Sequence, residues 1–299
     1  MNYQGIIKTT NMLTQSVTKM SYMSPSCHII PSTELGLKLN SLSEDVLKLS
    51  NVKFKPAKTI EEACERAISE YGIKSLKIQN IDVANDTLYA LHTIKSKSIT
   101  MLGIEEIIEV PIIQNNPDIM GSICTTTGVM KISDCGLKRT ISNKMSKLSM
   151  TVPPDKMNEY QNLLIKMSEG KIPLFRLTQD MEKMGIKASS LSELPFQTIL
   201  HEQGHRAHYL NMINKDDYWM MGKLAEIKEM GITNYSVYEE FVSPEIQNTI
   251  KSWPFLGDYA CTSPCEFVAE VYSALIHGIK VPDNIMKLYY KYHGPKVIC

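Results

Sequence analysis

Residues 201–205 read His201-Glu202-Gln203-Gly204-His205, and this stretch indicates both the local structure and the chemistry of the chain. In a helix, residues four apart lie about 6 Å further along the axis and about 40° round it, so both imidazoles can reach one metal ion. Zinc suits such a pair best, with the glutamate acting as general base toward a water on the metal. The stretch therefore predicts a helix with His201 and His205 as zinc ligands and Glu202 as catalytic base.

A catalytic zinc site needs a third protein ligand and an open fourth position. His208 continues the same helix face as His201. Its axial rise from His201 is about 10 Å, which is too long for both to bind one ion at about 2 Å. We therefore expect His208 to flank the site at the surface or to support a ligand from behind. The third ligand is expected to be a carboxylate further along the chain.

A second predicted helix, Pro264 to His277, carries Glu266 and Glu270 four residues apart on one face. Two acids on a partly buried face need positive partners. A zinc ion bound to Glu266, and a ligand imidazole N–H that donates to Glu270, would satisfy both. In the alternative interpretation, Glu266 forms a capping box with Ser263, with proline at the first helical position.

Other candidate ligands have weaker patterns. Glu239 and Glu240 are third-ligand candidates, but their segment lacks the paired-acid helix pattern, so we interpret them as surface acids. Cys261 and Cys265 form a lone C-x3-C pair without a second pair, which favours small buried residues over metal thiolates. Glu266 is therefore the preferred third ligand.

The HExGH stretch and the later Glu266-Phe267-Val268-Ala269-Glu270-Val271-Tyr272 together resemble the metalloprotease domain of anthrax lethal factor and its relatives, which include Pro-Pro endopeptidases and toxin or effector domains. The resemblance implies that Glu266 is the third ligand of a single catalytic Zn²⁺. It also implies that Tyr259, seven residues earlier, supplies its hydroxyl to the transition state.

The resemblance covers residues from about 190 to 280, and it has two departures. The stretch between the motifs is long, since His205 and Glu266 are 61 positions apart, so an insertion from Tyr218 to Trp253 would shape the substrate cleft. In addition, Val268 and Val271 replace the more usual Phe and Ala.

Composition excludes some classes of partner. Thirty-two basic residues balance thirty-two acidic ones in 299 residues, so no overall charge favours nucleic acid or an anionic membrane. Seven irregularly spaced cysteines do not resemble a disulfide framework, which favours a reducing compartment such as the cytosol. No apolar run is long enough to span a bilayer, so we expect a soluble chain without an integral membrane segment. The oligomeric state is not determined by the sequence.

The order of predicted elements favours an α+β fold of zincin type, in which a small mixed sheet precedes a helical C-terminal half. We expect a flexible leader and N-terminal extension over residues 1–55 and a zinc metalloprotease domain over residues 56–299, with its active-site core at about 190–280. Besides the two site helices, the patterns predict several elements. They are helices from Thr59 to Gly72, from Pro153 to Gly170 and from Pro282 to His293, and strands at Leu76 to Val83, Ile99 to Ile113 and Val129 to Ser133.

We therefore expect a zinc-dependent endopeptidase of narrow specificity whose substrate is a protein. The resemblance implies that this substrate is a host protein and that the enzyme is a secreted or translocated toxin or effector. The alternative is a zincin-fold protein with weak catalysis that serves as a protein-binding module. The intact Glu202 favours the enzyme, because a binding module does not need a general base.

Overall fold

The computed structural model describes residues 54–97, 103–116, 119–133, 152–169, 171–172, 174–186, 188, 190–193, 196–223, 229, 231 and 239–298. Contacts divide the chain into two units, residues 1–41 and 42–299, and all described residues belong to the second. The predicted N-terminal extension lies outside the described residues, apart from Phe54 and Lys55. Phe54 is buried, with its ring 5.1 Å from that of Tyr89.

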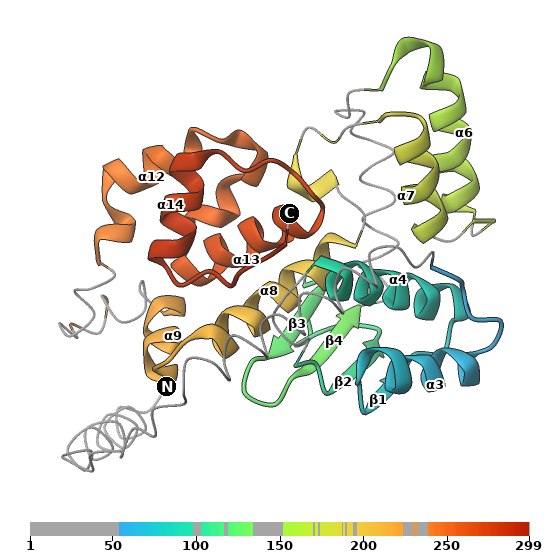
Figure 1. The fold of residues 1–299 in the computed structure, drawn as a ribbon, viewed down its shortest axis with the longest axis horizontal. Coiled ribbons are helices and arrows are strands. Elements are labelled where there is room, and N and C mark those ends of the chain that lie inside the picture. The colour runs from blue at the N-terminus through green and yellow to red at the C-terminus, as the bar shows by residue number, and fades with distance from the viewer. Residues whose placement is uncertain are drawn as a thin grey trace, which may run out of the picture. The chain divides into compact units, whose positions relative to one another are not determined.

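The described strands form one four-stranded sheet in the order β1-β2-β4-β3 (Figure 1). Strands β1, β2 and β4 are parallel, whereas β3 pairs with β4 in antiparallel register, with Gly121 opposite Ile132. Strand β3 therefore lies at one edge of this sheet. The strands are β1 (Ser75–Lys77), β2 (Glu106–Val110), β3 (Gly121–Cys124) and β4 (Val129–Ser133).

The helix predicted from Thr59 to Gly72 is confirmed as α3 (Ile60–Tyr71). Its first turn is capped by the Thr59 hydroxyl, which accepts the N–H of Glu62, and Gly72 ends it at a φ of 70°. That left-handed conformation favours glycine, which explains why the helix stops at this residue.

The strand predicted from Leu76 to Val83 is wrong beyond Lys77, where β1 ends, because a helix, α4 (Ile81–Lys97), begins at Ile81. The Asn80 side chain caps this helix by accepting the N–H groups of Asp82 and Val83. The pairs Leu76 and Ile78, and Ile81 and Val83, each have the two-residue spacing of a strand, but further along the apolar residues follow the helical period. The buried apolar residues of α4 are Val83, Ala84, Leu88, Ala90, Leu91 and Ile94.

The strand prediction for 99–113 is too long, since within the described residues strand structure is confined to β2, which ends before Pro111. The strand predicted from Val129 to Ser133 is confirmed as β4. Strand β3 was not among the predicted strands. The predicted α+β class, with a small mixed sheet before a mostly helical C-terminal half, is confirmed.

Helices follow the sheet along the chain. The predicted helices after Pro153, at the HExxH stretch, from Pro264 and from Pro282 are all found, whereas α7, α9 and α12 were not predicted individually. The α-helices are α6 (Met157–Ser168), α7 (Leu174–Lys183), α8 (Gln197–Asn211), α9 (Lys215–Gly222), α12 (Pro244–Lys251), α13 (Pro264–Ile276) and α14 (Asp283–Lys291). Short 3-10 helices are η1 (Pro154–Lys156), η2 (Leu191–Glu193), η3 (Glu240–Val242), η4 (Pro254–Leu256) and η5 (Asp258–Cys261).

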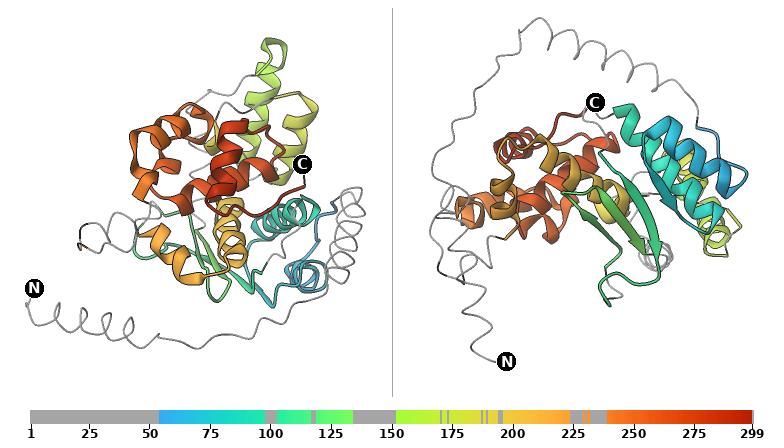
Figure 2. Two further views of the ribbon diagram at one scale, coloured as in Figure 1. Left: turned by 60° about the vertical axis from the view of Figure 1, so that its left-hand side comes forward. Right: turned by 90° about the horizontal axis from the view of Figure 1, so that it is seen from below.

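Helix α8 lies between the sheet and the C-terminal helices (Figures 1 and 2). It contacts β3 on one side and α13 on the other. Among the described helices α13 is the most deeply buried, with all but one of its thirteen residues buried, and the exception is Glu266. Within the described residues, no helix combines the length and apolar character needed to cross a bilayer.

Candidate metal centre

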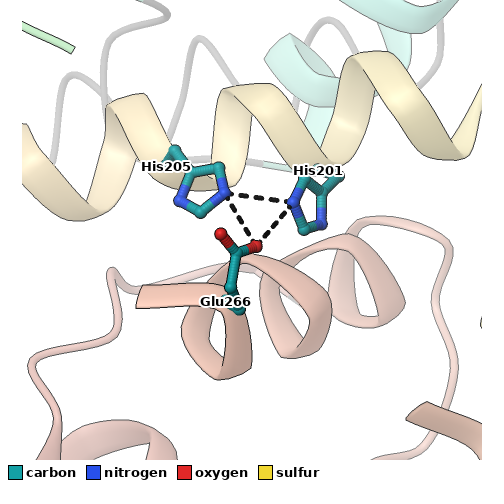
Figure 3. Close-up of side chains that lie close together, drawn as sticks. All are labelled: His201, His205 and Glu266. Carbon is teal, nitrogen blue, oxygen red and sulfur yellow. Dashed lines mark hydrogen bonds and ion pairs between the residues drawn. The ribbon is translucent and has the colours of Figure 1, made fainter. Parts of the chain in front are cut away.

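Helix α8 brings His201 and His205 together, as the four-residue spacing predicts. Their ring centroids are 4.7 Å apart, and their Nε2 atoms are 3.0 Å apart. Residues one helical turn apart share a helix face, and both rings point toward α13 (Figure 3). The backbone enters α8 through Phe196, which has a φ of 59° and is buried.

Glu266, in the first turn of α13, completes a compact group with the two histidines (Figure 3). Its Oε2 atom lies 3.0 Å from His201 Nε2 and 3.1 Å from His205 Nε2. Within the part of the chain that the structure describes, this is the one group of three His, Cys, Asp or Glu residues whose ligand atoms all lie within 4.8 Å of one another.

The capping role of Glu266 and its place in this group do not exclude each other. The backbone N–H of Glu266 donates to the Ser263 hydroxyl, at 3.2 Å, so Ser263 is the N-cap of α13. In a full capping box the glutamate side chain would turn back to the N-cap N–H. Here its carboxylate contacts the two histidines instead.

The close approach of α8 and α13 depends on a glycine and an alanine. A Cβ atom added at Gly204 would lie 2.8 Å from the Cα of Ala269 and 3.0 Å from its carbonyl oxygen. Such distances are shorter than van der Waals contact, so any side chain at Gly204 would push the helices apart. The glycine of the HExGH stretch therefore lets Glu266 reach the histidines.

The three atoms fit a zinc ion in type, number and spacing. Ligand atoms around a tetrahedral ion with bonds of about 2.0–2.2 Å lie about 3.3 Å apart, close to the separations of 3.0–3.1 Å here. Two imidazoles and a carboxylate with an open position are also the ligand set of known catalytic zinc sites.

The charges at the site favour a bound cation. Burial disfavours the protonated form of His201, but the carboxylates of Glu266 and Glu270 outweigh it and raise its pKa to about 10. Burial would raise the pKa of Glu266, yet hydrogen bonds from His201 and His205 hold it well below its usual value. The group therefore stabilises positive charge beside an ionised carboxylate.

Glu270 holds the far side of the His201 ring, as the sequence predicts. Its Oε1 atom is 3.1 Å from His201 Nδ1, and its Oε2 atom accepts a hydrogen bond of 3.1 Å from the Gln197 amide. Gln197 in turn accepts one of 2.5 Å from the Ser273 hydroxyl. This chain fixes the ring so that Nε2 points at the group.

A cleft of about 500 Å³ opens beside His201. Glu202 lies in it beside strand β3, where a Cβ added at Gly121 would be 3.1 Å from Glu202 Cγ. Burial raises the pKa of Glu202, partly offset by His205 and His201. Residues from β3, α8 and the η4–η5 segment form its walls. The apolar lining residues are Ile119, Met120, Phe196, Ile199, Phe255 and Leu256.

Tyr259 lies on the opposite rim of this cleft, in η5. Its side chain is 55% exposed, and its ring centroid is 5.8 Å from that of His201. Partial burial and the nearby Glu266 carboxylate raise the pKa of Tyr259, so its hydroxyl stays protonated and can donate a hydrogen bond into the cleft.

The weaker candidate ligands lie outside the group. Glu239 is exposed, and Glu240 forms a 2.8 Å ion pair with Lys291. Cys265 is buried, and its thiol donates to the carbonyl of Tyr218 at 3.4 Å, while Cys261 is half-buried. Neither cysteine shares a metal-binding group with other described residues.

His208 is fully buried, so the expectation of a surface position is wrong. Its ring centroid is 5.2 Å from that of Tyr218, on the side of α8 behind the metal group. Burial lowers the pKa of His208 to about 3, and the nearby His205 adds to this effect. His208 is therefore a neutral packing residue behind the site.

Sequence reasoning missed Gln197, Ser273 and Tyr218, whose hydroxyl lies 3.3 Å from His205 Nδ1. No residue spacing marks these contacts, because each joins two different helices.

Comparison of the chain with protein-family models, with curated proteins and with solved structures found no match.

Proposed function

We propose that the protein is a zinc-dependent endopeptidase of zincin type that hydrolyses peptide bonds in a protein substrate. The observation that supports this most is the convergence of His201 Nε2, His205 Nε2 and Glu266 Oε2 at 3.0–3.1 Å, with Glu202 beside them in an open cleft. The His201, His205 and Glu266 side chains would hold one Zn²⁺. When bound, zinc supplies Lewis-acid activation of water and of the substrate carbonyl.

The other side chains at the site would transfer the proton, stabilise the oxyanion and orient a ligand ring. Glu202 accepts the proton of the attacking water and passes it to the leaving amine, which its buried position and raised pKa favour. Tyr259 donates its hydroxyl proton in a hydrogen bond to the developing oxyanion. Glu270 keeps the His201 ring in place.

The cleft also suits an extended peptide. Strand β3 is at the edge of the sheet, and Ile119, Met120 and Gly121 line the cleft at its start. An extended substrate can add to such an edge through main-chain hydrogen bonds. The motif resemblance extends this proposal in three ways. It suggests a narrow substrate range, a host protein as substrate and a role as a secreted or translocated effector.

The test compares N-terminal peptides in a cell lysate treated with wild type or with Glu202→Gln. New N-termini that appear with wild type and are absent with Glu202→Gln are expected, because the amide cannot accept the proton. Glu240→Gln removes a carboxylate outside the site and serves as the matched control, with wild-type cleavage. Once a substrate is known, Tyr259→Phe should lower kcat more than it raises KM.

Equal sets of N-termini for wild type and Glu202→Gln would contradict the proposed endopeptidase activity. If the purified protein also carried no zinc, the binding-module alternative would be the better account. Zinc content is therefore measured on the same preparations.

A further inference from the structure

The two histidines of the metal group are supported in different ways. The Nδ1 atom of His201 faces the carboxylate of Glu270, as described above. The Nδ1 atom of His205 instead faces the hydroxyl of Tyr218, at 3.3 Å. Tyr218 comes from α9, which neither of the two motifs includes.

The chemistry of imidazole fixes the direction of this contact when His205 binds a metal. A neutral ring that gives its Nε2 lone pair to an ion must carry its proton on Nδ1. The Nδ1–H group then donates to the phenol oxygen of Tyr218, which is able to accept it. A tyrosine side chain with its ordinary pKa of about 10 is a neutral phenol at neutral pH, so its oxygen can accept this hydrogen bond.

The position of the Tyr218 hydroxyl is set by both helices that carry the metal group. The Tyr218 ring meets that of Tyr209, on α8, edge-on at a centroid distance of 5.4 Å. Its edge-on contact with His208 ties it to the same helix. Its backbone carbonyl accepts the thiol of Cys265, the residue before Glu266 on α13. Tyr218 is 5% exposed, so its hydroxyl is held in a largely dry environment where a hydrogen bond is effective.

We propose that Tyr218 is a positioning residue that holds the His205 ring, through its Nδ1–H, in the orientation and tautomer that bind zinc. This inference rests on the proposed zinc site and deepens it. Because partners of ligand histidines contribute about 10–100-fold to metal affinity, Tyr218→Phe should weaken zinc binding by at least about tenfold. The substitution keeps the ring and its contacts and removes the hydroxyl alone.

The experiment measures the zinc dissociation constant of metal-free protein by competition with a chromophoric chelator. Tyr209→Phe is the matched control, because it removes a hydroxyl from the same ring cluster on a side chain that does not contact the metal group, and its affinity should stay within about twofold of wild type. A second readout is the ring N–H signal of His205 in histidine-labelled, zinc-loaded protein. In wild type this proton should be hydrogen-bonded and protected from exchange, and in Tyr218→Phe it should lose both properties while the His201 signal stays unchanged.

Wild-type affinity in Tyr218→Phe would overturn this inference and leave the proposed function standing. Absence of zinc binding by wild type would overturn both. Should Tyr218→Phe fail to fold, the wild-type signal decides, since an unprotected His205 Nδ1–H contradicts the proposed contact.

Discussion

At the scale of single residues, Gly204 determines how closely the two site helices approach. Glycine inside a helix costs about 1 kcal/mol relative to alanine, so a Gly→Ala change there would ordinarily stabilise the protein. At Gly204 the new methyl group would meet the backbone of Ala269 at 2.8 Å. Overpacking of this kind costs about 1–3 kcal/mol, which exceeds the gain in helix propensity.

Gly204→Ala should therefore lower the free energy of unfolding by up to about 2 kcal/mol and weaken zinc binding, because Glu266 moves away from the histidines. Gly222→Ala is the control within α9, since its added Cβ would make an ordinary 3.6 Å contact with Cys265. It should keep or raise stability. Urea unfolding and zinc titration of both variants measure these effects, and unchanged zinc affinity in Gly204→Ala would refute the role of the glycine.

At the scale of elements, the start of α13 has two separable functions. The Ser263 hydroxyl caps the helix through the Glu266 backbone, whereas the Glu266 side chain belongs to the metal group. Ser263→Ala should therefore cost about 1 kcal/mol of stability and leave one zinc bound. Thr59→Ala removes the corresponding cap of α3 and should cost a similar amount.

Glu266→Gln should leave the Ser263 cap of α13 intact and greatly weaken zinc binding. Thermal unfolding and zinc analysis of the three variants separate the two functions. Zinc affinity that falls with Ser263→Ala and not with Glu266→Gln would mean that Glu266 acts only in capping.

The elements also show how far sequence reasoning reaches. The contact of His201 with His205 could be predicted because it is local to one helix, and the pairing of Glu266 with the site could be proposed from its spacing from Glu270. The contact of Tyr218 with His205 could not be predicted, since it depends on how α9 packs on α8. Helix α4 was missed for another reason: its first turn shares the alternating apolar pattern of a strand, and the deciding signals, the Asn80 cap and the later helical period, lie further along.

At the scale of the whole molecule, a metal ion would join parts of the chain that are far apart in sequence. The metal group links α8, which packs on the sheet, to α13 in the C-terminal helices. A ligand that binds only the folded state stabilises it by about 2.7 kcal/mol at 100 times its dissociation constant. Removal of zinc should therefore weaken the packing of α13 on α8 and lower the stability of the folded state.

Zinc removal with a chelator should lower the Tm of wild type by about 5–10 °C under such conditions. The same chelator should leave the Tm of Glu266→Ala unchanged, because that variant has no zinc to lose. Differential scanning calorimetry with and without the chelator provides the measurement. An equal shift in both proteins would indicate that the chelator acts elsewhere.

The most direct test of the central claim is the zinc content of purified protein, measured by elemental analysis after dialysis. Wild type and Glu202→Gln should each retain about one zinc ion per chain, and Glu266→Ala should retain almost none, because it leaves two of the three protein ligands. Wild-type protein without zinc, or equal zinc in wild type and Glu266→Ala, would contradict the His201, His205 and Glu266 site.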